Sequence, residues 1–578
     1  MTPEHTAAAA LTLALELPAT MIDLASADTA IGSSLHESLE RHVTELMTAL
    51  GIPGPCRAEV SVRSDDVPPG DKLLRVTVDG RHARYPDEML VRAFSYVTER
   101  IPDPEISPAT IRQWIEHGSH ASADAHAQAM VVEFLSLACM ETLKYQPSLL
   151  FGPAQAAAYA GSMTQAAGAN RAASAVDVNG TWLMNVLGQV LDLRISIADQ
   201  AAVADVLARG FAIDRSPQDI AEDVIDRLRS DAIEVRAQRT YLEQLTSRWE
   251  EDAPAMFPFM RDGLFEELGL VFPSLRFVED DRLKASCLAF KVNDLVFLPL
   301  RGLEAGELLV NDTVQRLRLS DLQGVATLNP ATGQPASVIG STVEVPPDLT
   351  TWNQMQFVVL GLAEFLRQHG WCVVHVQGVR QLLESLGRAL PALKALVVSR
   401  VSDQDLARVM RALVRDRASA RNLPLILERW LDYDMLRRQN ATPPIAAREA
   451  TRRNALEFVR AGLAREIASK VTRHTNTAVV YLVDTNIARL TAMHSVSELG
   501  ETGDAILQAI RAELAHLPRT AQVPHLLVFT ESRATLQRLV ASEFPRMTVF
   551  AHEELPPGTN VMPVARIAFS APAASAAG

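Results

Sequence analysis

Leu406, Val409 and Leu413 stand at helical spacing and are followed by the run Arg421-Asn422-Leu423-Pro424-Leu425-Ile426-Leu427-Glu428. The spacing of the three apolar residues predicts one buried face of a helix. Asn422 has a side chain that caps helices, so a second helix is expected to begin directly after it. The apolar positions of this second helix share one face and are expected in the core: Leu423, Ile426, Leu427 and Leu431.

These two helices belong to a longer segment, residues 352–440, whose patterning is helical. Strand patterns precede it, in an α/β unit that is expected to start near residue 260. The strand candidates of this unit are Leu275–Val278, Cys287–Val292 and Leu295–Leu300.

A further α/β domain is expected on the C-terminal side. Residues 477–484 and 525–530 are apolar runs, typical of strands buried on both faces. Helices are expected at 500–516 and 531–542, and a third strand at Val549–Ala551.

The N-terminal part has its own alternation of patterns. Residues 10–50 are expected to be helical, and the alternation at 57–63 and 73–79 predicts two half-buried strands. Helical patterning continues at 101–150 and 178–245. The Ala-, Gly- and Ser-rich segment 153–176 between them is a loop, a linker or a soft helix.

The predicted fold class is therefore α+β multidomain, with small α/β modules alternating with helical blocks and an α/β domain at the C-terminus. The order of elements raises an internal duplication, with copies at about 10–240 and 255–440; the alternative is two unrelated α+β modules. The expected parts are an α/β module at 1–100, a helical region at 101–245, an α/β module at 246–350, a helical subdomain at 351–445, a C-terminal α/β subdomain at 446–570 and a disordered tail at 571–578.

Composition limits the function classes. The 578 residues are 48% hydrophobic and 21% charged, as expected of a globular protein. The net charge of −14 argues against a general nucleic-acid surface, and the 5% aromatic content argues against binding single strands by stacking. Four distant cysteines without a CxxC motif are expected to be buried thiols in a reducing compartment: Cys56, Cys139, Cys287 and Cys372.

The sequence predicts neither a signal peptide nor an integral membrane segment. The apolar stretch Ala7–Leu15 follows no Lys or Arg, and it is too short to cross a bilayer.

Catalytic and metal-binding motifs are also missing. The sequence contains no GxxxxGK[ST], GxSxG or HExxH. His117, His120, Asp124 and His126 are close in sequence, but they are expected in a solvated loop rather than at a metal. We therefore expect no catalytic residue, no cofactor and no metal.

Seven short stretches of the C-terminal half resemble, in order, the cytoplasmic part of the FHIPEP family of type III secretion and flagellar export-gate proteins. They are Glu267-Leu268-Gly269 with Pro273 and Leu275–Val278; Gly306–Leu309; Gly324–Ala336; Leu362–Arg367 with Gln377–Leu383; Arg421–Glu428; Val459–Ile467; and Thr530–Arg533 through Leu539, Pro545, Val549 and Glu553–Leu555. The resemblance spans residues 260–567. It departs from the family in that the membrane half has no counterpart and Asn329 replaces the family's Asp.

The resemblance implies a protein that recognises secretion substrates, chaperones or other export components, or assembles as a homo-oligomeric ring or scaffold. Such a protein would be cytoplasmic, or held at the inner membrane through a partner, and would not be an enzyme. Two alternatives stay open: a standalone scaffold or regulator of another bacterial assembly, and an enzyme with an unrecognised site.

Two groups of residues are candidates for binding partners. Asn329, Pro330, Gly333 and Pro335 form a turn-forming segment, which is either structural or a loop that contacts a partner. Arg421, Asn422 and Glu428 mark the start of the second helix. The guanidinium of Arg421 suits a carboxylate at a subunit interface, or else it is solvated.

Overall fold

The computed structural model divides the chain into two compact units. The first contains residues 1–258 and 273–365, and the second contains 259–272 and 366–578. The six-part division expected from the sequence stays a prediction. The structure describes residues 10–63, 72–120, 123–166, 180–212, 215–230, 232–247, 249–270, 274–439, 455–473, 475–518, 521 and 523–568.

The first unit begins with a strand, where the sequence predicted a helix over 10–50. Strand β1 (Leu11–Leu17) lies inside a sheet of order β2-β1-β3-β4, and its four leucines are fully buried. The run Leu-Thr-Leu-Ala-Leu-Glu-Leu alternates with a period of two, which suits a strand and not a helix. The other strands are β2 (Cys56–Val62), β3 (Arg75–Val78) and β4 (Arg81–Ala83), of which β2 and β3 confirm the two strands expected from the sequence.

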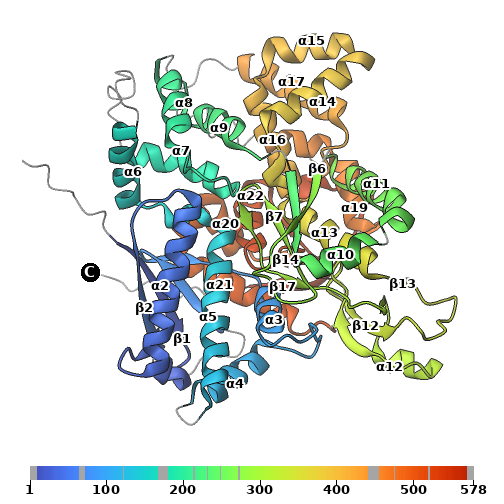
Figure 1. The fold of residues 1–578 in the computed structure, drawn as a ribbon. Coiled ribbons are helices and arrows are strands. Elements are labelled where there is room, and N and C mark those ends of the chain that lie inside the picture. Colours follow the sequence, from blue (N-terminus) through green and yellow to red (C-terminus); the bar gives the residue numbers. More distant parts are fainter. Residues whose placement is uncertain are drawn as a thin grey trace, which may run out of the picture. The chain divides into compact units, whose positions relative to one another are not determined.

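Helix α2 (Ala30–Leu50) connects β1 to β2. Thr29 caps it by accepting a hydrogen bond from the Gly32 amide, and Gly51 ends it with φ = 75°. Glycine meets no steric penalty in this left-handed conformation, which explains its place there. Helix α2 packs side by side with α5 (Figure 1). The helices that follow the sheet are α3 (Asp87–Val97), α4 (Pro108–Ser119), α5 (Ala125–Tyr145), α6 (Pro153–Ala166), α7 (Gly180–Asp192), α8 (Gln200–Ala212) and α9 (Pro217–Leu228), with a short helix η2 (Pro147–Leu150) after α5.

A second sheet starts earlier than the sequence indicated. Strand β5 (Ala232–Ala237) lies within the segment 178–245 that was predicted to be helical, and before the α/β unit expected near 260. Its burial alternates, and it pairs in parallel with β6 (Ser274–Glu279) and antiparallel with β7 (Cys287–Val292). Strand β8 (Leu295–Val296) completes the order β6-β5-β7-β8, and the short strand β9 (Leu300–Arg301) also pairs with β7. Helices α10 (Arg239–Ser247) and α11 (Trp249–Leu268) connect β5 to β6.

A third, antiparallel sheet of order β11-β12-β10-β13 completes the first unit. Its strands are β10 (Glu307–Val310), β11 (Val325–Leu328), β12 (Pro335–Gly340) and β13 (Thr351–Trp352). Buried Val310, Leu317, Leu322 and Ile339 form its small core. Helix α13 (Gln354–His369) follows and continues into the second unit.

The second unit contains the helical block that the sequence placed at 352–440 (Figure 1). The block consists of α14 (Val376–Ala389), α15 (Pro391–Arg400), α16 (Asp403–Arg415) and α17 (Leu423–Gln439). Leu406, Val409 and Leu413 of α16 are buried, and so are all four apolar residues predicted for the core face of α17. The helical prediction around residue 420 is confirmed.

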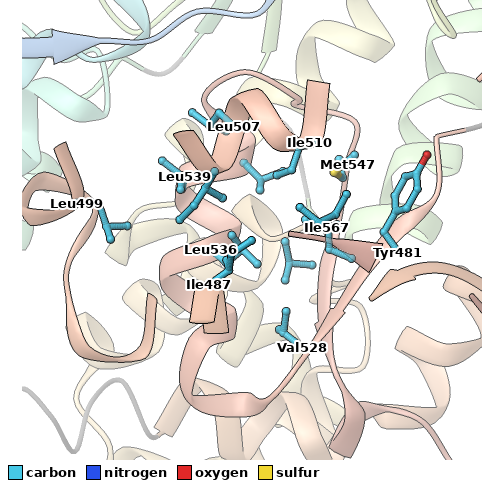
Figure 2. Close-up of a cluster of buried hydrophobic side chains, with 14 residues drawn as sticks. Tyr481, Ile487, Leu499, Leu507, Ile510, Val528, Leu536, Leu539, Met547 and Ile567 are labelled. Carbon is cyan, nitrogen blue, oxygen red and sulfur yellow. The ribbon is translucent and has the colours of Figure 1, made fainter. Parts of the chain in front are cut away.

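The C-terminal domain is a parallel sheet of order β16-β15-β14-β17. Figure 2 shows its core, where leucine and isoleucine side chains of three helices gather over the strands; among the fourteen buried residues are Ile487, Leu507, Leu536 and Ile567. The elements are α19 (Ala464–Thr472), β14 (Thr477–Val483), α20 (Thr485–Met493), α21 (Val496–Leu514), β15 (His525–Val528), α22 (Thr530–Ala541), β16 (Val549–Ala551), a short helix η5 (His552–Glu554) and β17 (Asn560–Ile567). Both apolar strands and Val549–Ala551 are confirmed.

The structure therefore confirms the α+β class, with several small sheets and helical blocks. All four cysteines are buried with free thiols, as expected. Burial raises the pKa of the Cys56 thiol to about 12 and that of Cys287 to about 11, so neither is a reactive thiolate near neutral pH. Within the described residues no single helix is long and apolar enough to cross a membrane; only α13 with its extension and α14, counted together, satisfy that criterion.

His525 at the start of β15 makes the C-terminal domain sensitive to acid. Burial, together with the nearby charges of Arg473 and Lys470, lowers the pKa of its imidazole from 6.5 to about 4. The unfolded chain therefore binds this proton more readily than the folded chain, and stability falls as the pH drops from about 6.5 towards 4. We expect a loss of about 1–2 kcal/mol between pH 7 and pH 5 in chemical denaturation, which H525Q should largely remove. An identical pH dependence in H525Q would contradict this assignment.

Candidate functional site

The first candidate segment is the turn between β11 and β12. The Asn329 amide donates to the Gln334 carbonyl (2.9 Å), and its side-chain oxygen accepts from the Ala331 amide (2.9 Å). The side-chain nitrogen donates to the side-chain oxygen of Asn311 (3.1 Å), which follows β10, so Asn329 also ties the turn to the end of that strand. Gly333 adopts φ = 68° and donates to the Asn329 carbonyl (2.7 Å).

The same turn leaves only its tip accessible. Asn329 and Pro330 are buried, Gly333 and Pro335 are half-buried, and Thr332 between them is exposed. The structure thus gives the first two residues a role in shaping the turn. A protein that contacts this turn would meet residues 331–335.

The second candidate group lies at the start of α17, in the other unit. Arg421 forms an ion pair with Glu266 of α11, and its side chain is 53% exposed. Asn422 caps the helix by accepting from the Leu425 amide (3.4 Å), as its residue type predicted, and donates to Glu466 of α19 (2.9 Å). Glu428 is exposed on the same helix. An exposed ion pair of this kind contributes little to stability.

The end of α11 is fitted closely against the residues before α17. The Ala420 amide donates to the Leu268 carbonyl (2.9 Å), and Gly269 follows in a left-handed conformation with φ = 73°. A Cβ atom on Gly269 would lie 2.0 Å from the Arg421 amide nitrogen. Backbone therefore packs on backbone here, which explains why a glycine follows the helix.

A buried ionic cluster, which the sequence did not reveal, joins the helical block to the C-terminal domain. Arg533 of α22 is fully buried; it donates to Asp416 after α16 (2.8 Å) and to both oxygens of Glu457 (2.8 and 2.7 Å). Arg460 is 1% exposed and donates to both oxygens of Glu554 (2.5 and 3.1 Å). The carboxylates raise the pKa of Arg533 against the opposing effect of burial, so its charge is permanent.

This cluster is structural in its chemistry. Its guanidiniums and carboxylates are occupied by strong, charge-assisted hydrogen bonds to one another. Both arginines and Glu554 stood in stretches that resembled the FHIPEP family, but their partners are far apart in the sequence. The one local signal is Arg533 among the apolar positions of α22, where a buried charge needs partners.

The described side chains of the histidine-containing segment 117–126 do not converge as metal ligands. His117 contacts the Gln113 carbonyl within α4, and Asp124 caps α5 by accepting from the Ala127 amide (2.6 Å). Among the residues whose placement is described, no three His, Cys, Asp or Glu side chains converge as a metal site would require.

The described residues form small α/β modules, a helical block and a parallel C-terminal sheet, and buried ion pairs join the last two within the second unit. A model of the FHIPEP family matches residues 212–560. The chain therefore belongs to the FHIPEP family, as the resemblance predicted, and the match begins earlier than residue 260.

Curated relatives come from flagellar and secretion systems. Flagellar biosynthesis protein FlhA of Bacillus subtilis is 21% identical over 358 residues, which are 59% of this chain and 50% of that protein. Low calcium response locus protein D of Yersinia pestis is 23% identical over 320 residues, 53% of this chain and 44% of that protein. This chain thus spans about half the length of the curated relatives it matches.

Solved structures agree on the fold. The Chlamydia pneumoniae CdsV protein is 21% identical, with a TM-score of 0.51 over 58% of this chain and 98% of that chain. The same protein in complex with CdsO matches 59% of this chain and 98% of its own length, with 21% identity and a TM-score of 0.51.

Proposed function

We propose that this chain is a non-enzymatic component of a type III export apparatus that recognises proteins and assembles with them. The observation that carries this proposal is the family match over residues 212–560, together with the fold shared with CdsV. The CdsV structure with CdsO suggests the kind of partner: a counterpart of CdsO, with secretion substrates and chaperones as further candidates. The expected place is the cytoplasm, with recruitment to the inner membrane by a membrane-bound partner.

We propose two surfaces of the chain for contacts with these protein partners. The tip of the β11–β12 turn presents residues 331–335, and the start of α17 presents Arg421 with Glu428 further along the helix. Asn329, Pro330 and Asn422 support these surfaces by holding the turn and capping the helix. Charged, exposed groups at the rim of a protein interface set specificity and association rate, and their loss has little effect on the fold.

Secretion by the host tests the function directly. A strain that lacks this chain is expected to lose export of the cargo of its type III apparatus, and a plasmid copy should restore it. Unchanged export, with loss of another assembly instead, would favour the alternative of a repurposed scaffold.

Arg421 offers a test of self-assembly. If copies of the chain associate through the start of α17, R421E should weaken association at least about tenfold, because a partner carboxylate would face a like charge. Stability should change by less than about 1 kcal/mol, since the ion pair with Glu266 is exposed. Sedimentation velocity over a concentration series measures the association.

The matched control is R209E on α8, which also removes an exposed ion pair, that with Asp205. R209E should leave association unchanged. Equal association of R421E and the unmodified chain would exclude this surface as the contact between copies.

A further inference from the structure

The two first sheets of the chain have the same construction. The orders β2-β1-β3-β4 and β6-β5-β7-β8 place corresponding strands in the same positions. In each sheet the first strand pairs in parallel with the second and antiparallel with the third, which forms a hairpin with the fourth. A helical connection joins the first two strands in both, and both hairpin turns begin with a residue at positive φ, Asp79 (47°) and Asn293 (51°).

The helical stretches that follow repeat at a constant distance along the chain. The short helix η4 (Gly370–Val373) begins 223 residues after η2, which starts at Pro147. The same separation holds for the starts of α6 and α14, the ends of α7 and α16, and the starts of α8 and α17. These four boundaries keep the same separation, so the two stretches differ by no net insertion between the first boundary and the last.

Local contacts repeat with the same separation. Arg194 and Arg417, 223 residues apart, are both in the left-handed conformation, at φ = 64° and 56°. Ser196 accepts a hydrogen bond from the Ala198 amide (3.3 Å), as Ser419 does from the Arg421 amide (3.2 Å). Positions 199 and 422, an Asp and an Asn, cap the next helix in the same way.

The contacts at the ends of α2 and α11, the long helices that connect the first two strands of each sheet, correspond as well. The Ile197 amide donates to the Leu50 carbonyl (2.8 Å), as the Ala420 amide does to Leu268 (2.9 Å). A left-handed glycine follows each helix, and a Cβ atom there would strike the backbone of the same corresponding segment. Irregular backbone details of this kind do not recur in the same order by a shared fold class alone.

The sequence left open an internal duplication or two unrelated α+β modules, and these observations favour the duplication. The second stretch begins at β5, earlier than residue 255, and the β10–β13 sheet is an insertion present in it alone among the described residues. Residues 11–211 lie before the family match, so nothing in that match assigns them.

The first stretch also binds the hairpin of the second within the first unit. The Asn293 side chain donates to the Leu193 carbonyl (2.7 Å), and Asp294 accepts from the Ser196 amide (2.7 Å). Nearby, Glu141 of α5 is 1% exposed and accepts from the Leu298 amide (3.0 Å), while Lys144 donates to the Val296 carbonyl (2.7 Å).

The junction between the two stretches contains buried charged groups of one stretch that bond to the backbone of the other. Such groups hold the two stretches together, because separating the stretches would leave the charges without partners. The Tyr145 ring packs edge-on against Phe297 at the same junction, 6.3 Å between ring centroids. The hairpin turn and the segment behind it are therefore covered.

We propose that residues 11–212 are a second copy of the module that begins at β5, and that this copy is a built-in partner that occupies the β7–β8 hairpin and keeps other proteins from it. The proposal does not depend on the export function. It assigns the hairpin surface to a partner of the same fold, supplied by the same chain.

A cleavable version of the full chain tests the junction. A protease site is inserted at residue 231, between α9 and β5, and the chain is cut after folding. The two fragments should then co-elute in gel filtration without denaturant. Separation of the unmodified fragments would overturn the proposal.

A hairpin variant tests which contacts hold the fragments. The double variant N293A/D294A should weaken their association at least about tenfold, because the two replaced side chains make two hydrogen bonds with the first copy. The matched control is D79A, at the corresponding turn of the first copy, whose side chain accepts from the Thr12 amide (2.9 Å). D79A should leave the association unchanged, and an equal loss in both variants would contradict the assignment.

Hydrogen exchange in the uncut chain gives an independent measurement. The Ser196 amide donates to Asp294, so its exchange should accelerate at least about tenfold in D294A. Unchanged exchange at Ser196 in a folded D294A chain would overturn the proposed junction.

Discussion

Replacing Arg533 by alanine is expected to destabilise the second unit by about 3–5 kcal/mol, the largest effect of any single substitution considered. The side chain is fully buried and holds two carboxylates, Asp416 at 2.8 Å and Glu457 through two bonds. Removing the guanidinium leaves buried Asp416 and partly buried Glu457 without their nearest cation, so the cost exceeds that of a lost surface ion pair. Urea denaturation, followed by a probe in the C-terminal domain, measures the change.

Two further variants make this prediction specific. R538A removes an exposed arginine from the same helix and should change stability by less than about 0.5 kcal/mol. Adding E457A to R533A should cost less than the sum of the two single changes, because the double variant leaves one fewer unpaired charge. If R533A lowers the free energy of unfolding by less than about 1 kcal/mol, the cluster does not hold the helical block and the C-terminal domain together.

Gly269 is the second position where one small change should have a large effect. G269A places a Cβ atom 2.0 Å from the Arg421 amide nitrogen and 2.3 Å from the Ala420 carbonyl carbon, so backbone must move. The left-handed φ of 73° costs about 1–2 kcal/mol for a residue with a Cβ atom, before any displacement is counted. Loss of the bond from Ala420 to Leu268 adds about 1 kcal/mol. We expect a total destabilisation of about 3 kcal/mol in chemical denaturation.

The matched control lies on the same helix. A Cβ atom on Gly263 meets nothing within 4 Å, and this glycine is exposed in the helical part of α11. G263A should therefore stabilise the chain by up to about 1 kcal/mol, since alanine is the better helix former. G51A is expected to resemble G269A, because its Cβ atom would lie 2.3 Å from the Ala198 amide nitrogen. If G269A and G263A change stability in the same direction, the close contact at Gly269 is wrong.

The helical block shows what the sequence could predict. The apolar positions of α16 and α17 repeat at helical spacing, and Asn422 is a capping residue; both features are local, so both predictions were confirmed. The helix predicted at β1 was wrong because the helical period was assumed for a run that alternates with a period of two. Its four leucines alternate strictly, but the helical α2 that follows led to one long helix being predicted over 10–50.

The candidate sites contain contacts between residues far apart in the sequence, and local sequence patterns cannot predict such contacts. A turn at Asn329 and Gly333 follows from their residue types, but burial of Asn329 depends on Asn311 of a neighbouring strand end. The ionic cluster draws its members from Asp416, Glu457, Arg460, Arg533 and Glu554, which only the tertiary fold brings together. Strand β5 was missed because six residues between two helices give too short a signal.

The proposed function requires this chain to bind a protein of the export apparatus. The most direct measurement is a calorimetric titration of the full chain with its host's own counterpart of CdsO, with R421E and R209E chains measured alongside. We expect saturable binding in the micromolar range or tighter by the unmodified and R209E chains. A full chain that is folded and yet shows no binding of this counterpart, while it binds components of an unrelated assembly, would contradict the proposed function.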